Sequence, residues 1–119
     1  YNLIVRLLND RFGIQVRGGW SCASTYAHYL FDFDEEKSKI MTNELLQKNL
    51  SNKPGWVRLS LHPTLKDEEL LFICNAIQKV SLHYEEWQSV YQYNPVTNEF
   101  DNLLAKETIA KDVKDWFVL

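Results

Sequence analysis

Apolar residues recur at the spacing of an α-helix along most of the chain, with charged and polar residues between them. We expect Gly13 to end the first helix and the acidic run Asp34-Glu35-Glu36 to begin the third, where carboxylates complement the helix dipole. The pattern predicts five helices, which run from Leu3 to Phe12, from Cys22 to Phe31, from Asp34 to Leu50, from Thr64 to Trp87 and from Leu103 to Phe117.

Alternation of apolar and polar residues predicts two strands. The first runs from Ile14 to Arg17 and is ended by Gly18-Gly19, and the second runs from Trp56 to His62. The order of these elements predicts an α+β fold, in which helices cover a small antiparallel sheet. The order is helix, strand, helices, strand and long helix. Because an isolated strand pair is only marginally stable, we expect at least one further strand to be missing or supplied from elsewhere.

The fourth helix is the longest. Thr64 is expected to cap it, with Asp67 at the capping-box position. Its buried stripe should include Cys74, which we interpret as a small apolar core residue. The full predicted stripe is Leu70, Ile73, Cys74, Ile77, Val80 and Tyr84.

Composition places the chain among ordinary globular domains. Its 119 residues suit one domain, and 45% of them are hydrophobic and 24% charged. The net charge of -3 and the lack of a basic stripe argue against a nucleic-acid partner. The longest apolar run, Leu70 to Ile77, is too short to span a bilayer, so no membrane partner is expected.

The cysteines and the first residue bear on the origin of the chain. Cys22 and Cys74 lie far apart and no signal peptide is present, which favours a cytoplasmic location. The chain starts at Tyr1 and its single methionine is Met41. We therefore expect an excised or processed piece of a longer protein.

Two residues are candidates for chemistry. Cys22 follows the Gly18-Gly19 turn and precedes a predicted helix, whose N-terminal amides would stabilise a thiolate. Arg58 lies at the centre of the second predicted strand and could grip a carboxylate with two parallel donors. From position alone, each has an ordinary alternative: Cys22 as a packed apolar residue and Arg58 as a solvated charge.

The histidines indicate no metal site. His28, His62 and His83 have no zinc-ligand spacing, so no metal is expected. The acidic clusters at residues 32–36 and 67–69 fall at helix starts, where capping explains them.

The order of these motifs resembles a known family. Its parts are Arg6 to Ile14, then Arg-Gly-Gly-x-x-Cys-Ala from Arg17, then Gly-x-Val-Arg-x-Ser from Gly55, then Pro63-Thr64 and the acidic start of the long helix. This combination resembles the C-terminal small domain of class V aminotransferase-fold enzymes, which are fold-type I pyridoxal-phosphate proteins. It is most similar to group II cysteine desulfurases and selenocysteine lyases, over about residues 1–87.

The resemblance implies roles for two residues, and the residues around them suggest two more. Cys22 matches the loop cysteine that attacks the sulfur of a substrate cysteine, and Arg58 matches the arginine that anchors the substrate α-carboxylate. Trp20 and Ser21 stand where the desulfurases usually have two histidines. Trp20 is expected to shape the substrate pocket or to pack as a lid, and His28 to face the loop near Cys22 or to serve in packing.

The resemblance also implies what lies outside the chain. Pyridoxal 5'-phosphate requires a Schiff-base lysine and a phosphate cradle, which in this family come from the large domain. We expect the cofactor in the full-length parent, a homodimer acting on an amino acid, and none bound to this fragment alone. Residues 1–93 would form the small domain and residues 94–119 a C-terminal helical extension.

A second hypothesis is a non-catalytic α+β protein-interaction module. In this alternative Cys22 is inert and aromatic side chains form a docking surface. The surface would comprise Trp20, Trp56, Tyr91, Tyr93 and Trp116.

Overall fold

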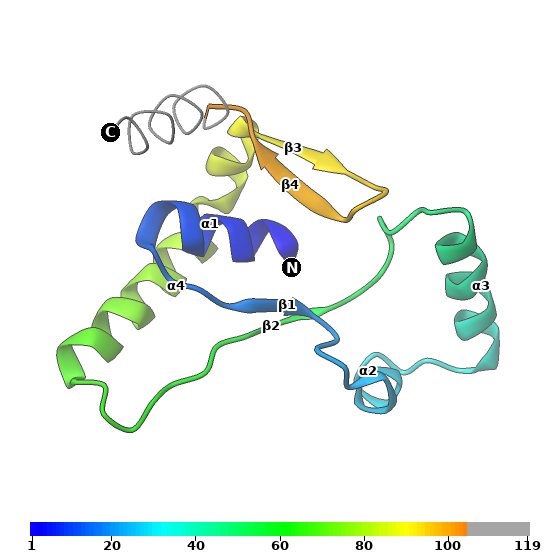
Figure 1. Ribbon diagram of the computed structural model, residues 1–119, viewed down its shortest axis with the longest axis horizontal. Coiled ribbons are helices and arrows are strands. Elements are labelled where there is room, and N and C mark those ends of the chain that lie inside the picture. Colours follow the sequence, from blue (N-terminus) through cyan, green and yellow to red (C-terminus); the bar gives the residue numbers. More distant parts are fainter. Residues whose placement is uncertain (105–119) are drawn as a thin grey trace, which may run out of the picture.

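The computed structural model describes residues 1–104, which adopt an α+β fold with two separate antiparallel pairs of strands (Figure 1). This confirms the predicted fold class. No helix in the described range is long and apolar enough to cross a membrane. The elements in order are α1 (Asn2–Phe12), β1 (Arg17–Gly19), α2 (Ser24–Leu30), α3 (Glu35–Leu46), β2 (Trp56–Arg58), α4 (Asp67–Trp87), the 3-10 turn η1 (Gln88–Val90), β3 (Tyr91–Asn94) and β4 (Glu99–Asn102).

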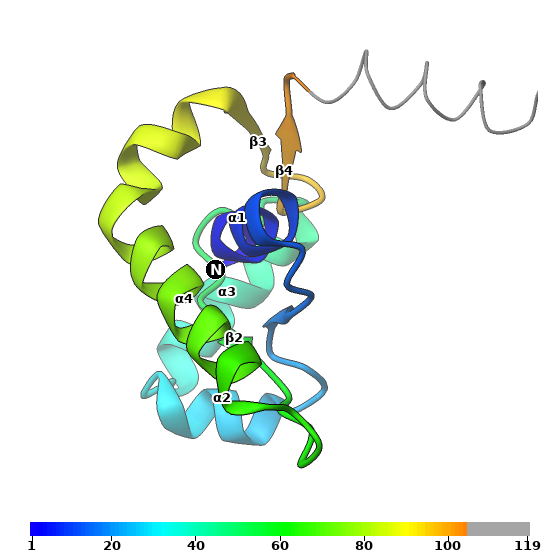
Figure 2. The same cartoon turned by 90° about the vertical axis from the view of Figure 1, so that its left-hand side faces the viewer.

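The core lies between α1, α4 and the β3–β4 hairpin (Figure 2). Leu7 and Leu8 of α1 meet Ala76 and Val80 of α4, and Tyr91 of β3 closes the cluster. All five side chains are at least nine-tenths buried. Helix α1 therefore organises this body, because it contacts α4 and both sheets.

Local sequence signals mark the predicted end of α1 and the predicted start of α3, whereas α3 ends at Leu46 rather than at Leu50. Gly13 ends α1 with a positive φ of 67°, and its N–H donates to the Asn9 carbonyl at 2.9 Å. The Asp34 side chain begins α3 by accepting a hydrogen bond from the Lys37 N–H at 2.7 Å.

The strand predictions need correction. β1 comprises Arg17–Gly19 rather than Ile14 to Arg17, so the two glycines belong to the strand instead of ending it. β2 comprises only Trp56–Arg58. The reason is that pairing, not alternation, defines these strands, and β1 and β2 each find a partner over just three residues.

The start of α4 also differs from the prediction. The helix begins at Asp67, and the Glu69 carboxylate accepts a hydrogen bond from the Lys66 N–H at 2.8 Å. Thr64 caps nothing; its hydroxyl pairs with His62 Nδ1 at 2.8 Å. A carboxylate three residues into the helix therefore takes the capping role instead of the threonine.

The predicted buried stripe of α4 is wrong in most positions. Val80 is buried, but Leu70, Cys74, Ile77 and Tyr84 are exposed. Helix α1 covers only one narrow side of α4, so apolar spacing along α4 overestimates what is buried. Cys74 is accordingly an exposed free thiol rather than a core residue.

Helices α2 and α3 form a lobe apart from this core (Figure 1). Aromatic contacts tie the lobe to β2: the rings of Tyr26 and Phe31 lie 5.7 and 6.1 Å from that of Trp56. On α3 only Met41 is buried, whereas Ile40 is 55% and Leu46 77% exposed.

The β3–β4 hairpin was absent from the sequence-based prediction. It pairs Tyr91 with Asn102 and Asn94 with Glu99, so it joins residues on both sides of the expected boundary between residues 93 and 94. The division into two domains stays a prediction. The predicted helix from Leu103 to Phe117 lies outside the described residues except for its first two, which form a turn.

Candidate functional site

The β1–β2 ladder carries the residues that the sequence motifs single out. Its register sets Arg17 opposite Arg58, Gly18 opposite Val57 and Gly19 opposite Trp56. Directly opposed residues of an antiparallel pair point to the same side, and successive residues alternate. Gly18 and Val57 therefore share one face of the ladder, and Arg17 and Arg58 share the other.

Helix α1 covers the face that holds Gly18. A Cβ built on Gly18 would lie 2.7 Å from Asn2 Oδ1 and 2.9 Å from the Tyr1 ring. A Cβ on Gly55 would lie 2.5 Å from the same ring. Glycine at both positions therefore lets the start of α1 lie directly on the ladder, and this contact directs Arg17 and Arg58 away from α1.

Arg58 lies at the end of β2, exposed on the uncovered face. Its side chain makes no hydrogen bond or ion pair with any residue in the range 1–104. A guanidinium without a carboxylate partner, on a paired strand, is free to receive an anionic ligand.

Cys22 occupies a strained turn directly after β1. Ser21 and Cys22 have φ values of 48° and 62°, and the Ala23 N–H closes the turn on the Trp20 carbonyl at 2.8 Å. Left-handed backbone at residues other than glycine costs about 1–3 kcal/mol each and is common at functional sites. The Ser21 hydroxyl is buried without a hydrogen-bond partner in the described structure, while the Cys22 thiol is exposed.

The structure places Cys22 before α2 but not on it. Helix α2 begins at Ser24 with Ala23 as its N-cap residue, and it comprises only seven residues. Cys22 thus precedes a helix as expected, but within residues 1–104 its thiol makes no hydrogen bond to the first amides of that helix. Exposure and turn geometry, rather than a helix terminus, are what distinguish Cys22.

Trp20 fastens this loop to the segment that leads into β2. Its indole Nε1 donates to the Pro54 carbonyl at 2.7 Å, and the Lys53 ammonium lies 5.2 Å from the ring centre. The Trp20 ring packs edge-on against His28 at 5.6 Å and Phe33 at 6.0 Å. Trp20 therefore packs within this chain, and its expected roles as a pocket residue or as a lid on the large domain stay predictions.

His28 lies in the same aromatic cluster. Its Nδ1 is 3.4 Å from the Ser38 hydroxyl, and no hydrogen bond joins it to Cys22 within residues 1–104. The structure thus brings His28 and Trp20 together, without a hydrogen bond from either side chain to the Cys22 thiol in the described range.

Arg58 lies at one end of the β1–β2 ladder, and Cys22 follows the other end, where Gly19 pairs with Trp56. The residue opposite Arg58 is Arg17, and the chain then runs along β1 away from Arg58 before it reaches Cys22. At about 3.4 Å per strand residue, the length of β1 separates the two. A ligand held by Arg58 would therefore need the Cys22 loop to move, or would have to span the ladder.

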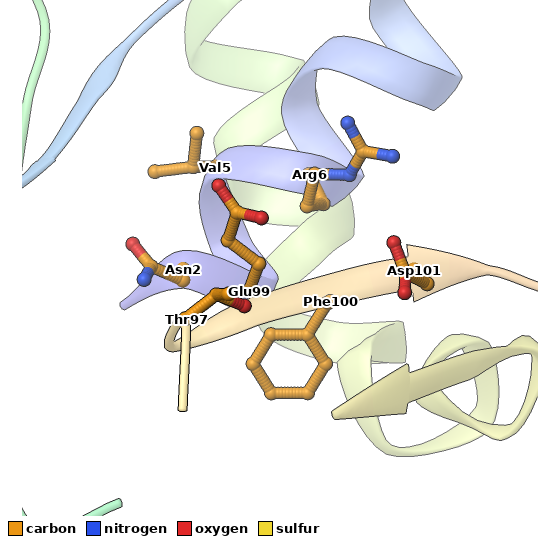
Figure 3. A pocket seen from close by; sticks show the side chains of 7 residues that line it. All are labelled: Asn2, Val5, Arg6, Thr97, Glu99, Phe100 and Asp101. Atoms are coloured by element: carbon orange, nitrogen blue, oxygen red, sulfur yellow. The ribbon is translucent and has the colours of Figure 1, made fainter. Parts of the chain in front are cut away.

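A pocket between α1 and β4, shown in Figure 3, escaped the sequence analysis. Its volume is about 290 Å³, and its lining includes Arg6 of α1 and the carboxylates Glu99 and Asp101 of β4. Arg6 Nε is buried without a hydrogen bond among the described residues and lies 3.9 Å from Asp10 Oδ2. The charged, aromatic, charged alternation of Glu99, Phe100 and Asp101 is typical of a strand with two carboxylates on one face. It points to this pocket only when residues 91–102 are recognised as a hairpin.

The described residues contain no group of three or more histidine, cysteine or carboxylate side chains that could hold a metal ion. Comparison with known proteins identifies no relative: no family model, no curated protein and no solved structure matches this chain. Functional assignment therefore depends on the motifs and the geometry.

Proposed function

We propose that the chain is the C-terminal small domain of a cytoplasmic, pyridoxal-phosphate-dependent enzyme of the class V aminotransferase fold, similar to cysteine desulfurases. It would act on an amino acid together with its own large domain, in a homodimer. The resemblance of the motifs motivates the proposal. The single structural observation that supports it is the exposed, unpartnered Arg58 on a paired strand.

Arg58 is proposed to bind the α-carboxylate of the substrate. A strand that is paired with β1 and packed through Trp56 against α2 holds its backbone in place. Bidentate binding by arginine then fixes the orientation of the amino acid as well as its position.

Cys22 is proposed to act as the nucleophile. Its thiolate would attack the substrate sulfur, so that an S–S bond forms and the C–S bond breaks with its electron pair left on carbon. The bound cofactor supplies stabilisation of that electron pair. The exposed thiol in a strained turn suits a group that must approach a substrate.

The role of Arg58 is tested in the full-length protein, by titrating amino acids while recording the absorbance of the cofactor. Arg58→Ala should weaken amino-acid binding about 10- to 100-fold, because charge-assisted hydrogen bonds are lost. Arg58→Lys keeps the charge but not the bidentate geometry, so its affinity for amino acids should lie between those of the wild type and Arg58→Ala. Unchanged affinity in Arg58→Ala would exclude the clamp.

The role of Cys22 is tested by sulfide release from cysteine. Cys22→Ala should abolish it, whereas Cys74→Ala removes the other exposed thiol and should leave it intact. Sulfide release that persists in Cys22→Ala would rule out Cys22 as the nucleophile.

The second candidate is the interaction module, which is favoured by exposed apolar side chains such as Leu46 on α3 and Leu82 on α4. The alkylation rate of Cys22 in a Cys74→Ala background discriminates between the two proposals. A rate above that of a model thiol at neutral pH supports the enzyme, and an equal rate in the full-length protein supports the module.

A further inference from the structure

Two arginines lie directly opposite each other in the β1–β2 ladder. The register pairs Arg17 with Arg58, and directly opposed Cβ atoms are about 4.5–5.5 Å apart. Both side chains are exposed on the face turned away from α1.

Neither guanidinium is neutralised by the described part of the chain. The ion pairs in residues 1–104 involve Arg6, Lys37, Lys39 and His83, and none reaches the ladder. Like charges in directly opposed positions destabilise a strand pair. Within residues 1–104 nothing offsets this repulsion, and a bound anion would remove it.

The surroundings give this pair a fixed geometry. Beside it on the same face lies Trp56, whose ring packs against Tyr26 and Phe31. Behind it, the contact of Tyr1 with Gly18 and Gly55 holds the ladder against α1. Two guanidiniums therefore project from one supported strand pair rather than from mobile loops.

We propose that Arg17 and Arg58 form one binding site for a dianion. The site goes beyond the carboxylate contact proposed for Arg58, because Arg17 adds a second guanidinium to it. The two arginines are one strand spacing apart, so a single oxyanion such as phosphate can accept hydrogen bonds from both.

The anion site is tested on the 119-residue chain alone, with inorganic phosphate as the probe at constant ionic strength. Saturable shifts of the arginine Nε–H resonances are expected. Arg17→Gln and Arg58→Gln should each weaken binding at least about tenfold, because each loses a charge-assisted contact. Lys79→Gln removes an equal charge from α4 and should leave binding within about twofold. Identical shifts with chloride at the same ionic strength, or no effect of Arg17→Gln, would overturn the proposal.

Discussion

Tyr1 lies on the ladder where two residues have no side chain. An ideal Cβ on Gly55 would be 2.5 Å from Cδ1 and Cε1 of the Tyr1 ring. The Tyr1 hydroxyl accepts a hydrogen bond from Asn98 Nδ2, so the ring is held on both sides. Gly55 therefore serves close packing rather than a turn.

Gly55→Ala should lower the free energy of unfolding by about 1–3 kcal/mol, because the added methyl group overpacks the contact with Tyr1. Urea denaturation measures the loss. In a Tyr1→Ala background the same substitution should cost less than about 0.5 kcal/mol, since the opposing ring is gone. An equal loss of stability in both backgrounds would show that the added methyl group acts through a contact other than the one with Tyr1.

Tyr91 connects the core to a charged group. Burial raises the pKa of its hydroxyl above 10.0, and Asp10 raises it further through its charge and the hydrogen bond that it accepts at 3.1 Å. The folded state therefore keeps the proton at pH values where the unfolded chain loses it. Stability should be fully present below about pH 10 and should fall as the pH rises through the folded pKa.

Tyr91→Phe should remove this contribution to alkaline destabilisation, and at neutral pH it should cost about 1 kcal/mol for the lost hydrogen bond. Urea midpoints measured across the alkaline range compare the two proteins. Equal alkaline loss in both would show that other groups, such as Tyr1, dominate it.

At the scale of elements, the sequence predicts what local chemistry decides. Gly13 and Asp34 mark helix ends through their own backbone and side chain, and both were found. The extent of β1 depends instead on residues nearly forty positions later, and the exposure of Cys74 depends on how narrowly α1 covers α4. Tertiary partners of this kind leave no local signal.

The residues of the candidate site were also predicted only where local motifs mark them. The order of motifs indicated Cys22 and Arg58, but it gave no role to Arg17, because only the register sets it opposite Arg58. The aromatic surroundings of Trp20 likewise required the position of Pro54 in space.

The cap of α3 offers a test at this scale. Asp34→Ala should destabilise α3 by about 1 kcal/mol, since the Lys37 N–H loses its partner. Hydrogen exchange of α3 amides should accelerate about fivefold, whereas amides of α4 should not change. Asp34→Asn retains an acceptor and should behave like the wild type; equal acceleration in both variants would contradict the capping role.

At the scale of the whole molecule, large apolar side chains remain at the surface of both α3 and α4. Leu46 is 77% and Leu82 70% exposed. Where such side chains form a patch, the patch is typical of a contact with another protein or domain. In the proposed enzyme this partner would be the large domain.

Leu46→Gln and Leu82→Gln should each change the free energy of unfolding by less than about 0.5 kcal/mol, because neither side chain is buried in this chain. Both should reduce binding of a hydrophobic fluorescent dye to the folded protein. Val80→Ala is the buried comparison and should cost about 1–3 kcal/mol. A large destabilisation by either leucine variant would show that its surface is covered within the chain.

The hydrogen bond between Asn98 and Tyr1 joins residues 97 positions apart, and α1 packs mainly on α4 and β4. During synthesis α1 therefore leaves the ribosome long before the partners that bury Leu7 and Leu8. At ordinary rates of translation the delay is roughly 5–20 s, far longer than a helix needs to form. The apolar face of the nascent α1 is thus open to chaperones during this interval, and Leu7 and Leu8 become buried only after α4 has been synthesised.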